Sequence, residues 1–108
     1  MPDFDLPEAK LAGEKHVELW LTENGYTNIV KEELRLNEMM LLAKGNIEHI
    51  LVHVITCIHP NRPYKLSEFE ADVVTRRAAK LQVTAYAAYV VIDTNNDLFE
   101  DIRWDRLK

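Results

Sequence analysis

The sequence is poor in cysteine, glycine and proline. It contains one cysteine, three glycines and four prolines among 108 residues, of which 47% are hydrophobic and 29% charged. This composition excludes a collagen-like polymer, and the hydrophobic content is too high for a disordered tail. A chain of this length buries roughly 65% of the surface that its unfolded form exposes, so its core needs neither a metal nor a disulfide. We therefore expect one domain over residues 1–108, with residues 1–6 as a loose tail.

A second cysteine and a long hydrophobic run are also missing. The single cysteine, Cys57, has no partner in the chain, which is typical of a protein in a reducing compartment. The longest unbroken apolar run, Ala85 to Ile92, is far shorter than the ~20 residues that span a bilayer. The acidic first segment, MPDFDLPEAK, lacks the basic segment and the apolar segment that together form a signal peptide. We predict a cytoplasmic protein that has no membrane partner.

Positive charge is scarce relative to negative charge. Thirteen Lys and Arg residues stand against eighteen Asp and Glu residues, so the formal net charge is −5. The molecule as a whole therefore does not attract nucleic acid or an anionic membrane. Binding to phosphate groups would need a local basic patch.

Apolar periodicity predicts two helices and five strands. Pro7 suits the first turn of the first helix, and Ser67 with Glu70 forms a capping box for the second. Gly45-Asn46 suits the tight turn of a hairpin. In chain order the predicted elements are a helix over 7–24, strands over 29–36, 38–44 and 47–58, a helix over 67–86, and strands over 87–93 and 98–104.

The order of these elements predicts an α/β fold. An antiparallel meander followed by a crossover helix implies a mixed sheet with helices packed against it. The strand over 47–58 has apolar side chains on both faces, which places it in the centre of the sheet. The apolar stripes predicted to face the sheet are Ala9, Val17, Trp20 and Leu21 on the first helix, and Val74, Ala78, Leu81 and Ala85 on the second.

Three segments carry a resemblance to a known family. Gly13-Glu14 precedes VELWLTENGY, EMMLLA begins at Glu38, and LVHVIT begins at Leu51. With the element order, these segments resemble the restriction-endonuclease-like PD-(D/E)XK superfamily, and within it small bacterial endonuclease-like proteins related to Holliday-junction resolvases. The resemblance covers roughly residues 12–95. It implies a three-layer sandwich with a mixed central sheet, order α-β-β-β-α-β-β, flanked by helices.

The resemblance extends to the scaffold but not to the reactive residues. Glu14 and Glu38 match acids of the family. Met40 stands where the family has a metal-binding Asp, His53 where it has a metal-binding Glu, and Ile55 where it has the catalytic Lys. A thioether is a poor ligand for Mg²⁺, and an aliphatic side chain supplies neither a proton nor a charge. We therefore expect a pseudo-nuclease that needs no cofactor.

The hairpin at Gly45-Asn46 predicts which side chains share a sheet face. A two-residue turn places Met40 opposite Leu51. It also places Glu38 opposite His53, a pairing that would favour the charged imidazolium, although a structural histidine is the alternative. Because side chains alternate along a strand, one face should carry Met40, Leu51, His53 and Ile55.

Basic residues gather near the second predicted helix. Such side chains contact phosphates in nucleic-acid complexes. Acidic residues lie among them, so a solvated face of mixed charge is the alternative. By the resemblance, Arg77 or Lys80 is the candidate for the residue near the scissile phosphate. The candidate nucleic-acid-binding residues are Arg62, Lys65, Arg76, Arg77 and Lys80.

Two sets of side chains contain residue types that can bind a metal ion. His49 and His53 would stand ~13 Å apart in a strand, whereas ligands of one zinc ion converge within bonds of ~2.0–2.3 Å. We therefore predict separate structural roles for His49, His53, Cys57 and His59. A relocated site for Mg²⁺ or Mn²⁺ built from Glu14, Glu38 and His53 is the alternative.

Three functions follow from these patterns. The first is a catalytically silent endonuclease-fold domain that binds nucleic acid or a partner that processes it. The second is a divalent-metal-dependent endonuclease with the relocated ligands. The third is a protein-interaction or homodimer-forming subunit, in agreement with the acidic net charge and the apolar sheet face.

Overall fold

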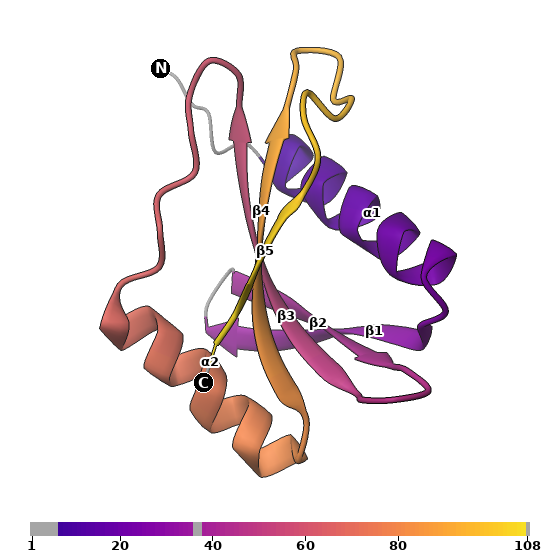
Figure 1. The fold of residues 1–108 in the computed structure, drawn as a ribbon. Helices are drawn as coiled ribbons and strands as arrows, with labels where there is room; N and C mark the ends of the chain where they lie inside the picture. The colour runs from indigo at the N-terminus through magenta and orange to yellow at the C-terminus, as the bar shows by residue number, and fades with distance from the viewer. Residues whose placement is uncertain (1–6, 36–37, 108) are drawn as a thin grey trace.

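The computed structural model describes residues 7–35 and 38–107, so the tail predicted over residues 1–6 lies outside the described residues. Two helices and five strands follow one another in the predicted order (Figure 1). They are α1 (Pro7–Glu23), β1 (Thr27–Arg35), β2 (Glu38–Lys44), β3 (Ile50–Ile58), α2 (Glu68–Leu81), β4 (Thr84–Ile92) and β5 (Arg103–Arg106).

The five strands form one mixed sheet in the order β1-β2-β3-β4-β5. The first three strands are an antiparallel meander, β3 and β4 are parallel, and β4 and β5 are antiparallel. The β3–β4 ladder is the longest contact, running from Ile50 opposite Thr84 to Ile58 opposite Ile92. The predicted α/β class, the mixed sheet and the central place of β3 are confirmed.

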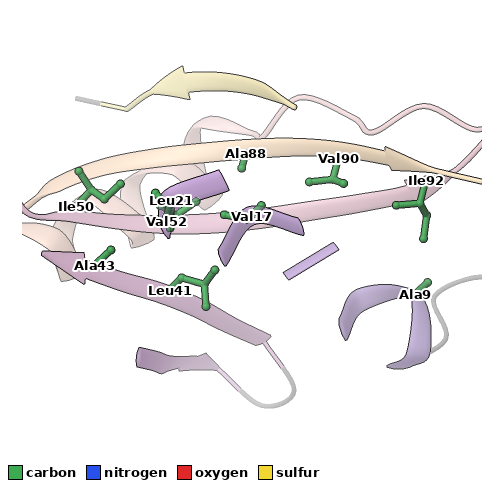
Figure 2. Packing of buried hydrophobic residues seen from close by; sticks show 10 residues of the cluster. All are labelled: Ala9, Val17, Leu21, Leu41, Ala43, Ile50, Val52, Ala88, Val90 and Ile92. Atoms are coloured by element: carbon green, nitrogen blue, oxygen red, sulfur yellow. The ribbon is translucent and has the colours of Figure 1, made fainter. Parts of the chain in front are cut away.

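The two helices cover opposite faces of the sheet, and each face has its own core (Figure 1). The first core, which we call the α1 core, is drawn in Figure 2; its buried members are Ala9, Val17, Leu21, Leu41, Ala43, Ile50, Val52, Ala88, Val90 and Ile92. The second, the α2 core, consists of Met40, Leu51, Ile55, Leu66, Val74, Ala78, Ala85, Ala87, Tyr89 and Leu107. Strand alternation produces this division, because neighbouring residues point to opposite faces.

Helix α1 follows the predicted stripe closely. Val17 and Leu21 are fully buried, and Trp20 packs at the edge of the α1 core. The helix lies close to β3 at Gly13, where an added Cβ atom would overlap the side chain of Thr56. The helix ends before Gly25, whose φ of +91° is readily adopted by glycine. No helix in the described part of the chain is long and apolar enough to span a membrane.

Helix α2 begins as predicted but ends earlier. Ser67 is the N-cap, and its reciprocal hydrogen bonds with Glu70 complete the capping box. The helix ends at Leu81, because Gln82 adopts the left-handed conformation with a φ of 61°. The prediction that this helix continues to residue 86 is wrong. Ala85 lies in β4, and Leu81 is exposed. Pairing with β3 determines the conformation of this alanine-containing segment more strongly than its helix propensity does.

Strands β2 and β3 pair in a register two residues away from the predicted one. Met40 lies opposite His53, and Leu42 lies opposite Leu51. The prediction that Glu38 lies opposite His53 is therefore wrong. Because a shift of two residues preserves the alternation of side chains, the α2-facing side still carries Met40, Leu51, His53 and Ile55, as predicted.

The register differs because the connection over residues 45–49 is longer than a two-residue turn. The Gly45 N–H donates to Nδ1 of His49 at 3.3 Å, and the Thr84 N–H donates to the His49 carbonyl oxygen at 3.0 Å. The Tyr86 hydroxyl donates to Oε2 of Glu48 at 2.8 Å. Burial, and then the neighbouring Glu48 carboxylate, raise the pKa of Tyr86, so its hydroxyl remains a donor. These contacts hold the loop, and β3 begins only at residue 50.

The last predicted strand also differs from the observed one. Leu98 makes an isolated bridge to Ile92, and the regular strand β5 begins at Arg103. The intervening segment lies beside α1, because Asp101 and Ile102 line one hollow together with Leu19, Trp20 and Glu23.

Candidate functional site

Two of the positions that the resemblance assigns to the reaction centre, Met40 and His53, lie in one row across the sheet, and Ile55 lies two residues further along β3 on the same face. Met40 of β2 pairs with His53 of β3, and the pairing continues to both edges. The row runs from β1 to β5 as Glu32, Met40, His53, Ala87 and Asp105. Paired residues share a face, so the row lies on the α2 side of the sheet. Acidic residues occupy its two ends, and apolar residues and a histidine occupy its middle.

Met40 and Ile55 are core residues. Met40 is 0% exposed and Ile55 is 7% exposed. Both belong to the α2 core, to which α2 contributes Val74 and Ala78. The thioether and the aliphatic chain therefore fill space that a hydrated metal ion would need, and they offer it no oxygen ligand. This confirms the predicted apolar face.

His53 has an acidic neighbour on α2. That neighbour is Glu70 of the capping box, whose Oε1 accepts the Ser67 N–H at 3.0 Å and whose Oε2 accepts the Tyr64 hydroxyl at 3.3 Å. These hydrogen bonds, above all the one from the Ser67 backbone, lower the pKa of the Glu70 carboxyl, and positive charge on His53 lowers it further. The effect of His53 is the smallest of these.

The lowered pKa of Glu70 predicts a specific acid sensitivity. A carboxyl group with a lower pKa in the folded state stabilises the protein above its unfolded pKa, and this contribution is lost as the pH falls through the folded pKa. We expect Glu70→Gln, which retains the acceptor of the capping box, to flatten the decline of the unfolding free energy in acid. Urea unfolding between about pH 7 and pH 3 measures this slope.

Glu68→Gln is the matched control for this experiment. Glu68 lies in the same first turn of α2 but accepts neither capping hydrogen bond. In Glu68→Gln the unfolding free energy should fall with decreasing pH as steeply as it does in the wild type. An unchanged slope in Glu70→Gln would exclude Glu70 as a source of acid sensitivity.

Glu14 lies on the opposite side of the sheet from this row. It belongs to α1, and its carboxylate forms an ion pair with Nζ of Lys31 at 3.2 Å. His53 has the strand parity that faces α2, so the structure does not bring Glu14 and His53 together. The side chain of Glu38, the third member of the proposed metal set, lies outside the described residues. Within the described residues, no three His, Cys, Asp or Glu side chains are grouped as a metal site.

The other metal-ligating side chains occupy different surroundings. His49 accepts a hydrogen bond within the β2–β3 loop, and His59 stacks on Phe99 with ring centroids 3.8 Å apart. Cys57 is partly buried.

Glu32, at the β1 end of the row, is an acid that the sequence patterns do not identify. It lies opposite Met40, and its Oε1 accepts a hydrogen bond from Nη2 of Arg77 at 3.0 Å. The contact joins β1 to α2 across the sheet face. The sequence offers no signal for this position, because β1 has irregular register near Thr27 and Glu33.

The predicted basic residues lie along α2 and the loop before it, and three of them are paired with acids. Arg76 contacts Asp72 at 2.9 Å one turn earlier, and Arg77 contacts Glu32. Arg62 reaches Glu100 at 3.3 Å. Lys65 and Lys80 are exposed. Acidic side chains thus lie among the basic ones, as the alternative of a mixed-charge face requires, and exposed ion pairs of this kind contribute only about 0–1 kcal/mol.

Comparison with known proteins adds no family: no protein-family description matches the chain, and no curated protein matches its sequence.

Proposed function

We propose that this protein is a catalytically silent domain of endonuclease-like fold that binds nucleic acid through the basic residues of α2. The observation that carries the proposal is the burial of Met40 and Ile55 in the α2 core. The resemblance requires a metal-binding carboxylate and a lysine at these two positions. Apolar packing there is consistent with a scaffold that has kept its layers and lost its reaction.

The missing groups are those that phosphodiester hydrolysis needs. Carboxylates hold Mg²⁺ against a phosphate, the metal lowers the pKa of the attacking water, and a lysine stabilises the developing charge. His53 by itself cannot supply these three functions. We therefore expect binding without cleavage, and no requirement for a divalent cation.

The α2 face offers cations for phosphate contacts. Arg76, Arg77 and Lys80 lie within little more than one helical turn of each other. Their intramolecular ion pairs are weak enough for a phosphate to compete with the carboxylates. Because the net charge is −5, long-range attraction is absent, and binding should be modest and sensitive to salt.

Fluorescence anisotropy tests the proposal directly. Labelled single-stranded, duplex and branched DNA, and RNA, are titrated at ~50 and ~200 mM salt with EDTA present. We expect saturable binding at low salt that weakens at high salt, and about tenfold weaker binding for Arg76→Gln combined with Lys80→Gln. Lys10→Gln, on α1 at the other side of the sheet, is the control and should leave affinity unchanged.

No binding to any of these probes at ~50 mM salt would contradict the nucleic-acid role. The same samples with Mn²⁺ in place of EDTA test the enzymatic alternative. Cleavage that persists through chromatography and disappears in Glu14→Gln would favour a relocated metal site.

A protein-binding role is the second candidate, and one observation favours it. Several large apolar side chains remain exposed, including Leu11 and Leu19 on the outer side of α1. Exposed apolar side chains that gather on one surface mark interaction sites.

A further inference from the structure

One flank of α1 and the segment over residues 93–102 form a groove. Two hollows of about 440 and 460 Å³ lie in series along the helix, and both are lined by His16. We call this surface the α1 groove; its apolar lining consists of Leu11, Ala12, Leu19, Trp20, Leu98 and Ile102. It lies on the opposite side of the sheet from α2 (Figure 1).

The wall of the α1 groove is fixed by hydrogen bonds. His16 Nε2 donates to the Asn96 carbonyl oxygen at 2.8 Å and ties the segment to the helix. Oδ1 of Asp93 accepts from the Asn95 and Asp97 N–H groups, and the Phe99 N–H donates to the Val91 carbonyl oxygen at 2.9 Å. The groove is therefore formed before a ligand arrives, which reduces the entropic cost of binding.

Large apolar side chains of the groove are exposed to solvent. Leu11 is 49% exposed and Leu19 is 57% exposed, and the two leucines lie about two helical turns apart on one side of α1. Leu98 on the facing wall is 40% exposed. Apolar residues on one face of an amphipathic helix recur at this same spacing, so such a helix from a partner could contact both leucines.

The charges around the groove are predominantly negative. Glu8, Glu23 and Asp101 line it, against a single lysine, Lys15. The sequence contains no Lys or Arg between Lys80 and Arg103, and the acids in that stretch are Asp93, Asp97, Glu100 and Asp101. A ligand with positive charges flanking an apolar stripe is therefore complementary, whereas nucleic acid is not.

The groove favours a helical ligand over an extended strand. Its walls present side chains, because the backbone groups of α1 are bonded within the helix and the facing segment bonds to itself and to β4. A strand would need an open sheet edge, while a helix satisfies its own backbone. From Glu8 to Glu23 the groove is about 22 Å long, enough for a helix of four turns.

We propose that the α1 groove binds a basic amphipathic α-helix of a partner protein. Leucine-type side chains of the partner would enter the two hollows on either side of His16. Its lysine and arginine side chains would face Glu8, Glu23 and Asp101. This inference does not rest on the proposed nucleic-acid role, because the two surfaces lie on opposite sides of the sheet.

The probe for this proposal is a fluorescein-labelled peptide of two consecutive Leu-Lys-Lys-Leu-Leu-Lys-Leu heptads, titrated with the full chain. We expect saturable binding that weakens about tenfold in Leu19→Ser combined with Leu98→Ser. Glu23→Gln combined with Asp101→Asn should weaken binding several-fold and reduce its salt dependence. An analogue of the peptide with Glu in place of every Lys should not bind.

A matched variant separates the groove from general attraction to an acidic protein. Ile47→Ser combined with Glu68→Gln removes an exposed apolar side chain and an exposed acid elsewhere, and it should bind the peptide within about twofold of the wild type. Amide chemical shifts should change along α1 and residues 93–102. Circular dichroism verifies that each variant is folded.

Three results would overturn the proposal. They are an absence of peptide binding, equal weakening by the groove and control variants, and light scattering that shows a dimer which the Leu19→Ser and Leu98→Ser changes convert to a monomer. The last result would assign the groove to a second copy of the chain. DNA and RNA anisotropy of the groove variants should equal that of the wild type, so either function can fail without the other.

Discussion

Met40→Asp is expected to lower the unfolding free energy by about 4 kcal/mol or more, which is most of the stability of a domain at the lower end of the ordinary range of about 5–15 kcal/mol. Met40 is fully buried between β2 and α2, among apolar side chains of the α2 core. A carboxylate placed there loses its hydration, and the surrounding side chains of the α2 core are apolar. Chemical denaturation followed by circular dichroism measures the loss.

The control is Met40→Leu, a substitution of similar volume that should cost less than about 1.5 kcal/mol. The comparison bears directly on function, because aspartate is the residue that the family resemblance expects at this position. A folded Met40→Asp protein that binds Mn²⁺ would mean that the metal site is still accessible. In that event a single carboxylate would restore the metal site of the family, and the apolar packing around Met40 would not by itself exclude the ion.

Gly13→Ala is expected to destabilise the fold by about 2 kcal/mol or more, although alanine is the better helix former by about 1 kcal/mol. The added Cβ would overlap Oγ1 of Thr56 and lie 2.9 Å from Thr56 Cβ and Cγ2. Relief requires α1 to move away from β3, and α1 cannot move without opening the α1 core. Urea denaturation measures the change.

A double-mutant cycle identifies the cause of this loss. Thr56→Ala removes two of the three atoms in conflict, so the double variant should recover at least about 1 kcal/mol relative to the sum of the single changes. Gly25→Ala is the control, because its added Cβ meets no atom within 4 Å and its cost comes from the φ of +91°. Thr56→Ala should not relieve that cost. Additive behaviour of Gly13→Ala and Thr56→Ala would show that the contact does not limit packing.

The order of elements was predictable from local patterns. Val17 and Leu21 recur at helical spacing, and the Ser67 and Glu70 pair identifies the start of α2 before any tertiary contact is known. Apolar residues of both parities in β3 predicted its burial on two faces, which its central position confirms. These signals are local because each depends on the periodicity of one element.

Register and element ends depend on contacts between distant segments, and here the sequence was insufficient. The His49 carbonyl accepts from Thr84, a residue of the second half of the chain, and this bond helps to hold the start of β3. The end of α2 is likewise determined by the pairing of Ala85 with Leu51. No residue pattern within either segment contains that information.

The candidate site was predictable to the same degree. The shared face of Met40 and Ile55 follows from strand alternation alone and survives a register shift of two residues. The partners of the site were not predictable. Glu70 approaches His53, and Arg77 reaches Glu32, because α2 packs across the sheet at a particular angle and position.

The parallel ladder between β3 and β4 has a consequence for how the domain folds. The α1 core takes Val52 from β3 and Val90 from β4, so neither half of the chain can cover α1 by itself. The meander closes through short loops, whereas the β3–β4 ladder forms only after α2 has crossed the sheet. Such non-local closure slows folding and concentrates the hydrophobic gain in a late step. We therefore expect both layers to form and to be lost together, as one cooperative unit.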